Sequence, residues 1–501
     1  MTTPPPSPAA DEADGVWVGL DLGTQSVRAL AVTGTGHVLG VGSRPLTSHR
    51  DGPRHEQDPD QWWQAVAAAS KEALQSVPAA AVRGVAVDAT SGTVLLTDPD
   101  GNPLTAALMY DDTRAADQVA RINEVGGHVW TELGYRRMQP AWALPKLLWL
   151  IREHPDLIGR ARLAHQNDVI NQHLVGHPVP TDLSNALKTG AHLIDETWPT
   201  EVLDTLGVPA RLLPDLVRSG TPIGTVSAAA AEVTGIPAGT PVISGATDGC
   251  AAQLGAGALR VGSWNSVLGT TLILKGVTRD LIRDPLGAVY SHKAPNGDWL
   301  PGGASSTGAG VISRDFAGRD LDRLNQAAST HEPASVISYP LVSNGERFPF
   351  VAPDARGFVL GDPVDDGDRF AGVLQGVGFI ERLCFDYLHL LGAPIDGSLI
   401  LTGGATKSAY WCQLRADILG RPVTLPENAE PALGMAVLAA SPGRSAADVA
   451  AEMVRVRSVI DPRPGTAGKY DDAYRVFVTE LEHRGWLQPD AATHARERTS
   501  R

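Results

Sequence analysis

A short motif near the start of the chain returns in outline about halfway along its 501 residues. The apolar run 16–20 leads into Asp21-Leu22-Gly23-Thr24, and Leu268-Gly269-Thr270 stands beside a second apolar run, 272–274. Each copy predicts an extended segment, a Gly-Thr turn and a second extended segment, which is a hairpin with a polar tip. Glycine lets the backbone approach an anion, and threonine hydroxyls and amides donate to phosphate oxygens. Two facing tips of this kind are suited to grip the phosphates of a nucleotide.

Length and composition favour two similar globular domains. A chain of 501 residues is longer than one hydrophobic core usually accommodates, and two domains of about 200 to 250 residues are the natural division. We expect a disordered tail at 1–14, a first domain at 15–253, a second domain at 254–487 and a flexible tail at 488–501. Strand-like runs alternate with amphipathic helices, as in the strand 82–87 after the helix 60–76, so the predicted fold class is α/β.

The net charge and the cysteines narrow the class of protein further. A net charge of −14 argues against a general nucleic-acid or anionic-membrane surface, although an anionic substrate can still occupy a local pocket. No apolar run reaches the roughly 20 residues that a membrane helix needs. Three cysteines without paired spacing predict reduced, buried thiols, and we expect a cytoplasmic protein that binds no nucleic acid and no membrane.

Two aspartates stand at predicted strand ends. Asp248 lies between Gly245 and Gly249 after an apolar strand, where a carboxylate can accept the proton that an attacking hydroxyl loses during phosphoryl transfer. Asp21 lies at the first tip, where it is suited to organise Mg²⁺, because magnesium favours oxygen ligands and keeps waters beside nucleotide phosphates. The structural alternative is that both aspartates only cap turns.

A third glycine cluster follows the predicted strand 398–401. Gly403-Gly404 precedes a helix that starts near Ser408, and such a helix start can face a phosphate or ribose. The chain lacks the Walker A spacing and has no G-x-G-x-x-G after its first strand, so two common nucleotide-binding folds become unfavourable interpretations.

Together these motifs resemble the FGGY family of carbohydrate kinases over nearly the whole chain. The resemblance rests on the ordered segments 21–28, 245–248, 268–271 and 403–423. It implies two actin-like, ribonuclease-H-like domains with an ATP and sugar cleft between them. It also implies Asp248 as general base and Asp21 as the Mg²⁺-organising residue, both touching substrate with Thr24. The implied ATP-binding positions, with the tip and shelf glycines added, are Thr24, Gln25, Arg28, Gly269, Thr270, Gly308, Gly403, Gly404 and Ser408.

The segment expected to read the sugar departs from the commonest relatives. Xylulose kinases usually carry S-G-Q-M-H-G where this chain has Asp88-Ala89-Thr90-Ser91-Gly92-Thr93. The segment is similar to the D-G-T-S of a D-ribulose kinase subgroup, which implies that the Ser91 hydroxyl binds the sugar. Asp112 and Arg114 match a further family segment, and they either touch substrate or form a buried ion pair that positions a loop.

The resulting hypothesis is an ATP- and Mg²⁺-dependent kinase that phosphorylates the terminal hydroxyl of a ketopentose, with D-ribulose as the expected acceptor. D-Xylulose is the alternative. Glycerol fits less well, because the Arg-Glu pair typical of glycerol kinases is absent around Ser91. A sugar-independent actin-like ATPase and a nucleotide-binding regulator without catalysis are the alternatives from other classes. The expected partner is a small-molecule ketose, and the expected assembly is a monomer or homodimer.

Overall fold

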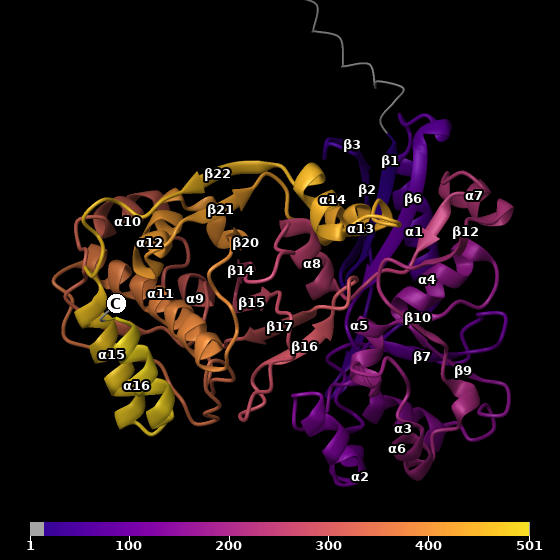
Figure 1. Cartoon of the computed structure of the whole chain (residues 1–501), viewed down its shortest axis with the longest axis horizontal. Helices are drawn as coiled ribbons and strands as arrows, with labels where there is room; N and C mark the ends of the chain where they lie inside the picture. The colour runs from indigo at the N-terminus through magenta and orange to yellow at the C-terminus, as the bar shows by residue number, and fades with distance from the viewer. Residues whose placement is uncertain (1–14, 500–501) are drawn as a thin grey trace, which may run out of the picture.

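The computed structural model describes residues 15–499, so the predicted tail 1–14 lies outside the described residues. Two α/β halves lie side by side along the long axis of the molecule, and the colour changes from indigo and magenta in one half to orange and yellow in the other (Figure 1). Each half is built around its own mixed sheet. This arrangement matches the two α/β domains that the sequence predicts.

The first sheet has the order β12-β13-β6-β1-β2-β3. Its strands are β1 (Val16–Leu22), β2 (Ser26–Thr33), β3 (Val38–Pro45), β6 (Val82–Ala89), β12 (Pro222–Thr225) and β13 (Pro241–Ile243). Helices α1 (Pro59–Ala73), α4 (Gln166–Val175) and α7 (Ala228–Thr234) share a core with one face of this sheet. Helices α8 (Asp248–Ala256) and α13 (Pro431–Ala439) contribute to the cores on the other face.

The second sheet has the order β16-β17-β15-β14-β20-β21-β22. Its strands are β14 (Trp264–Leu268), β15 (Leu272–Gly276), β16 (Tyr290–Lys293), β17 (Trp299–Ala304), β20 (Leu399–Thr402), β21 (Val423–Pro426) and β22 (Val456–Ile460). The largest core joins this sheet to α11 (Asp366–Leu390), α12 (Ala409–Leu419), α15 (Asp471–His483) and α16 (Pro489–Arg498). A separate core below the first sheet contains α2 (Val119–Glu132), α3 (Ala143–Glu153) and α6 (Thr200–Leu206).

The predicted hairpins are present in both halves and share one local topology. β1 pairs antiparallel with β2 and parallel with β6, while β14 pairs antiparallel with β15 and parallel with β20. The Gly-Thr sequences form the two hairpin turns, closed by the N–H of Gly23 to Ser26 O at 3.1 Å and of Gly269 to Thr271 O at 3.2 Å. The repeated motif therefore marks a repeated supersecondary unit.

Helix α1 shows how local sequence produces the expected element. Asp58 caps its start by accepting from the N–H of Asp60, and Pro59 occupies the first turn, where a missing N–H is harmless. Trp62 and Val66 are fully buried on its apolar face. The helical spacing of these two residues places both against the first sheet.

Two segments pack in places that the sequence alone did not predict. Helix α13, assigned by sequence to the second domain, packs against β1 and α8 of the first half, and Figure 1 shows it beside β1 and β2. A Cβ at Gly19 would lie 1.7 Å from Ala432 O, and a Cβ at Gly434 would lie 2.0 Å from Ala251 O. Glycine at both positions permits this close contact.

The predicted flexible tail at 488–501 also differs, because it contains α16, whose Ala492 and Ala495 are fully buried. Small side chains let this helix pack closely on the second core, which sequence polarity did not reveal. The three cysteines are buried free thiols, as predicted. Among residues 15–499, no helix combines the length and apolarity needed to cross a membrane.

Candidate active site

Three carboxylates gather where adjacent parallel strands of the first sheet end. Asp21 lies near the end of β1, directly opposite Asp88 on β6 in the parallel register. Asp248 is the first residue of α8, which follows β13, the parallel neighbour of β6. The carboxyl ends of parallel strands share one sheet edge, which brings these three side chains together. Sequence reasoning named Asp21 and Asp248 but assigned no catalytic role to Asp88.

Burial dominates the electrostatics of the Asp21–Asp88 pair. Burial raises the pKa of Asp21 to about 6, partly offset by a hydrogen bond from Asp88. Asp88 is fully buried, and burial together with the charge of Asp21 holds its pKa well above the usual range. Two neighbouring carboxyls in a poorly solvated position cannot both ionise easily. Without a cation, burial and the neighbouring carboxylate therefore favour the protonated form of Asp88.

The pair fits a magnesium ion that keeps water ligands. Neither oxygen of Asp88 receives a hydrogen bond from a donor within the described part of the chain, so both remain available to a cation or its waters. Residues 15–499 contain no group of three or more His, Cys, Asp or Glu side chains that could enclose a metal. Mg²⁺ commonly uses one or two carboxylates together with waters and phosphate oxygens. Asp21 and Asp88 match that donor set, whereas a site made only of protein ligands is not formed.

Asp248 accepts hydrogen bonds from the backbone and is influenced by the charges of two lysines. Burial raises its pKa, while the charge of Lys188, the Gly249 N–H, the charge of Lys275 and the Ser91 N–H act in the opposite direction. The Gly249 N–H donates to Oδ1 over 2.7 Å. These contacts favour the ionised carboxylate, which is the form that accepts a proton.

Lys188 is a site residue that sequence reasoning missed. It lies in the short turn of helix Leu187–Thr189, and its Nζ donates to the carbonyl of Ser91 over 3.0 Å. Burial lowers its pKa to about 8. The signal in the sequence was a lone lysine between Leu187 and Thr189, but nothing local showed that it faces Ser91.

The Ser91 hydroxyl is buried and has no hydrogen-bond partner on the described chain. Its peptide groups are occupied, because the carbonyl accepts from Lys188 and the N–H faces Asp248. The next residue, Gly92, has φ +94°, and a Cβ there would lie 3.1 Å from Lys188 Cδ. Glycine at position 92 therefore leaves room for the Lys188 side chain beside the Ser91 loop. The Ser91 hydroxyl, which has no protein partner in residues 15–499, is available to bind a ligand oxygen.

The glycines predicted to bind nucleotide fall into two groups. A Cβ at Gly269 or Gly404 would meet nothing within 4 Å, so both backbones face open space. A Cβ at Gly308 would lie 2.5 Å from Thr270 O, and one at Gly403 would lie 2.6 Å from Leu268 O. Gly308 and Gly403 thus serve close backbone packing, while Gly269 and Gly404 leave room for a ligand.

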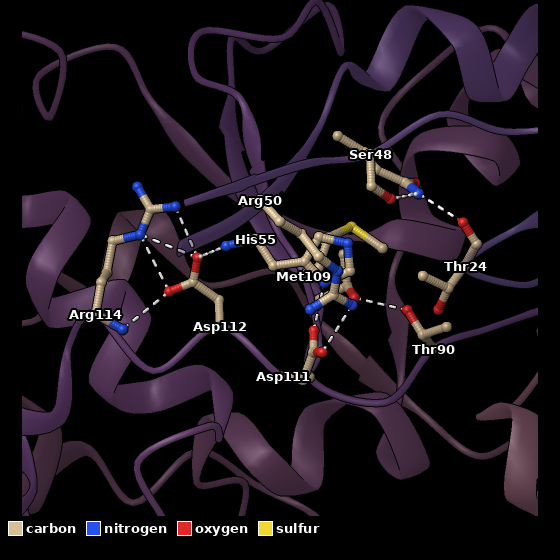
Figure 2. Close-up of polar contacts among 12 residues, drawn as sticks. Thr24, Ser48, Arg50, His55, Thr90, Met109, Asp111, Asp112 and Arg114 are labelled. Carbon is tan, nitrogen blue, oxygen red and sulfur yellow. Dashed lines mark hydrogen bonds and ion pairs between the residues drawn. The ribbon is translucent and has the colours of Figure 1, made fainter. Parts of the chain in front are cut away.

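The first tip is tied to its surroundings by backbone contacts. Gln57 donates to the carbonyl of Thr24 over 2.7 Å and to Ser48 over 2.9 Å, and Figure 2 shows Thr24 and Ser48 on either side of this link. The carbonyl of Gln25 accepts from the Leu46 N–H over 2.8 Å. The Thr24 hydroxyl is not used by either contact, so it remains a candidate donor to phosphate or substrate.

Two other predicted nucleotide residues have structural partners. Arg28 Nε lies 2.6 Å from the carboxylate of Glu430, the residue that precedes α13. Ser408 caps α12 by accepting from the Trp411 N–H over 3.1 Å. Both contacts order elements beside the tips, and the proposed ATP contacts of these residues stay predictions.

Asp112 and Arg114 form the ion pair that was one of their two interpretations. Arg114 Nη2 lies 2.7 Å from Asp112 Oδ2, and Arg114 also contacts Glu56 over 2.6 Å. The His55 N–H donates to Asp112 over 2.7 Å, and Figure 2 shows Asp112 between these partners. The fully buried Asp112 is thus satisfied by protein groups, which fits a loop-positioning role.

Comparisons with known proteins agree over most of the chain. Residues 16–255 match the N-terminal domain of the FGGY family of carbohydrate kinases, and residues 265–442 match its C-terminal domain. Xylulose kinase of Streptomyces coelicolor is 32% identical over 450 residues, covering 86% of this chain and 89% of the relative. Xylulose kinase of Bacillus subtilis is 26% identical over 484 residues, covering 93% and 96%. The solved xylulose kinase of Rhodospirillum rubrum has a TM-score of 0.82 at 26% identity, covering 93% of this chain and 98% of that chain.

Duplicated α/β halves, two Gly-Thr tips and a carboxylate cluster at the end of the first sheet define a phosphotransferase with the actin-like fold. The chain belongs to the FGGY family of carbohydrate kinases. This confirms the predicted family, fold class and enzyme class. The expectation that D-ribulose is the main acceptor is less well supported than its alternative, because the most similar relatives described above are xylulose kinases.

Proposed function

We propose that this kinase transfers the γ-phosphoryl group of ATP to the terminal hydroxyl of a ketopentose, with D-xylulose as the first candidate acceptor. The observation that carries the proposal is the position of Asp248 beside Lys188 and the Ser91 loop, on the same sheet edge as Asp21 and Asp88. The names of the relatives support D-xylulose. The small molecule is a sugar, since the family consists of carbohydrate kinases.

The proposed reaction assigns one role to each group. The sugar hydroxyl attacks the γ-phosphorus, Asp248 accepts the hydroxyl proton, and the bond to the ADP oxygen breaks. Asp21 and Asp88 would hold Mg²⁺, which supplies positive charge to the phosphate oxygens when bound. The open backbones at Gly269 and Gly404 leave room for phosphates and the nucleotide. Lys188 keeps the Ser91 loop and the Asp248 charge in place.

D-Ribulose is retained as a second candidate because of one observation. Ser91-Gly92 stands where xylulose kinases usually carry Met-His, and the buried Ser91 hydroxyl has no partner on the described chain. A hydroxyl in place of an imidazole pairs with a different sugar hydroxyl, and an unpaired polar group in a closed site rejects the wrong isomer.

The test is coupled ADP release with Mg-ATP and D-xylulose, D-ribulose, both L-ketopentoses or glycerol. We expect turnover with a ketopentose that is lost in Asp248→Asn, and poor ATP hydrolysis without sugar. A higher kcat/KM for D-ribulose than for D-xylulose, reduced selectively by Ser91→Ala, would favour the second candidate. Absence of turnover with every sugar would overturn the proposed ketopentose activity.

A further inference from the structure

A buried lysine and histidine face away from the second core, on the side toward α8. In β15, Leu272 and Leu274 point into the second core, whereas Ile273 and Lys275 lie on the opposite face. Ile273 is 41% exposed, while Lys275 is only 8% exposed. Lys275 Nζ lies 2.9 Å from Nδ1 of His292 on β16. The two side chains therefore form one buried polar pair.

Within residues 15–499, no acidic side chain forms an ion pair or a hydrogen bond with this pair. Lys275 forms no ion pair there, and its hydrogen-bond partner is His292. Burial, reinforced by the charges of Lys275 and Lys188, holds the pKa of His292 well below its usual range, so the ring is neutral. Because Nδ1 accepts from Lys275, Nε2 carries the ring proton. That buried N–H has no hydrogen-bond partner on the described chain.

The pair lies beside the proposed general base. A Cβ added to Gly249 would lie 3.9 Å from Lys275 Nζ, and Gly249 directly follows Asp248 at the start of α8. The charges of Lys275 and Lys188 both act on the Asp248 carboxylate. In an extended strand Lys275 lies about 16 Å from Thr270, at roughly 3.3 Å per residue over five residues, so it is not part of the phosphate tip. The pair belongs to the acceptor side of the site.

The chemistry of the pair selects the kind of ligand atom. Lys275 has further N–H donors, His292 offers Nε2–H, and Ser91 offers a hydroxyl, while no carboxylate in residues 15–499 forms an ion pair with Lys275. Buried donors without partners are unfavourable unless a ligand supplies oxygen acceptors. A carbonyl or carboxylate oxygen accepts two hydrogen bonds and has no proton to clash with these donors.

We propose that Lys275 and His292 form the subsite that binds the ketone oxygen of the acceptor and so select a ketose over the corresponding polyol. The inference rests on the proposed function, because it assigns a binding subsite to the ketone group of the same ketopentose whose terminal hydroxyl is phosphorylated. A sugar acid would present the same sp² oxygen chemistry from a carboxylate. We favour the ketone over the carboxylate, because the proposed acceptor is a ketose.

The experiment compares three acceptors of one carbon skeleton: D-xylulose, xylitol and xylonate, with D-ribulose and ribitol as a parallel pair. Wild type, Lys275→Met, Lys275→Arg and His292→Gln are tested, and Lys293→Met is the matched control. Lys293 follows His292 on β16 but contacts Trp299 and Glu196. For Lys275→Met we expect KM for the ketopentose to rise roughly 10- to 100-fold, the loss typical of a charged hydrogen bond, with kcat changed less than about threefold. Xylitol should be a poor acceptor for wild type and be little affected by the substitution.

Binding of the ketopentose without ATP, measured calorimetrically, gives a readout that is independent of turnover. Wild-type selectivity for ketose over polyol that is lost in Lys275→Met and partly kept in Lys275→Arg supports the subsite. Equal losses for ketose and polyol, or an unchanged KM and dissociation constant, overturn it. Better phosphorylation of xylonate than of any ketose, again lost in Lys275→Met, overturns the ketone assignment in favour of a carboxylate.

If wild type phosphorylates no acceptor, the proposed function fails, whereas active wild type with unaffected variants refutes only the subsite. A variant that does not fold is replaced by His292→Gln, which removes the ring but leaves Lys275.

Discussion

Asp88 lies directly opposite Asp21 in the parallel pairing of β6 with β1, and the charge of Asp21 helps to raise the pKa of Asp88. The fully buried Asp88 carries the more strongly raised pKa, while that of Asp21 is raised to about 6. Without a bound cation, burial therefore favours the protonated form of Asp88. A substitution at Asp88 is therefore expected to change the stability of the metal-free protein independently of its effect on activity.

The first prediction concerns Asp88→Asn. The folded state binds a proton on Asp88 more tightly than the unfolded chain, so this group's contribution to stability falls as pH rises from about 4 toward the raised folded pKa. The amide cannot ionise and can still donate to Asp21. We expect Tm of the metal-free variant to exceed that of wild type by roughly 2–4 °C at pH 8, the shift for about 1 kcal/mol in a domain of this size, and the difference to shrink near pH 4. Thermal melts across pH in EDTA test this, and a constant difference would contradict it.

The second prediction concerns Asp248→Asn. Removal of a general base typically lowers the rate by about 10²- to 10⁴-fold. We expect kcat to fall by that factor while ADP binding and Tm remain close to wild type. Because burial raises the pKa of Asp248, wild-type kcat/KM should decline on the acid side at a higher pH than an ordinary carboxylate gives. A full pH–rate profile checks this, and an unchanged kcat in the variant would refute the base assignment.

The third prediction concerns Lys188. Its charge favours the ionised form of Asp248, so its removal raises the pKa of that carboxylate further. In Lys188→Met we expect the acid limb of kcat/KM to move to higher pH and KM for the sugar to rise, since the Ser91 carbonyl loses its donor. Lys188→Arg keeps the charge and should restore the position of the limb. A uniform loss of activity without a pH shift would indicate a purely structural role.

The fourth prediction uses two adjacent glycines as a matched pair. Gly403 has φ +87° and a Cβ there would lie 2.6 Å from Leu268 O, so Gly403→Ala should lower Tm markedly. A Cβ at Gly404 meets nothing within 4 Å, so Gly404→Ala should keep Tm within about 2 °C. If nucleotide lies against Gly404, ADP affinity in that variant should fall roughly 10-fold, as for a methyl group placed in a filled contact. Calorimetric ADP titration decides this, and wild-type affinity would remove Gly404 from the nucleotide site.

The fifth prediction separates the ion pair of Arg114 from substrate binding. Its side chain and that of Asp112 are almost completely buried, and breaking such a pair costs about 3–5 kcal/mol. Arg114→Ala should therefore lower the urea midpoint strongly. The folded fraction should keep the wild-type KM for the sugar, because Asp112 is satisfied by protein donors. A selective rise in KM without loss of stability would instead support substrate contact.

Local sequence patterns were sufficient for the elements that carry the phosphate tips. The apolar runs around Gly23 and Gly269 specify strands, and a Gly-Thr turn between two strands specifies a hairpin, so the repeat could be read without tertiary information. Asp248 was identified for the same reason, since it follows an apolar strand and opens a helix. The choice of sugar acceptor was less accessible to sequence reasoning, because we propose that it depends on which side chains surround Ser91.

The sequence by itself determined the duplicated hairpins, the α/β class, the family resemblance and two of the three carboxylates. Only the tertiary structure placed Asp88 opposite Asp21, brought Lys188 to Ser91 across 97 positions of sequence and paired Lys275 with His292. It also showed that α13 packs against the first sheet and that α16 packs on the second core. Hairpins and helix starts follow from neighbouring residues, whereas parallel register and the meeting of buried side chains depend on packing between distant segments. For that reason the two Gly-Thr hairpins could be predicted from local sequence, whereas the groups proposed to face the sugar were brought together only by the fold.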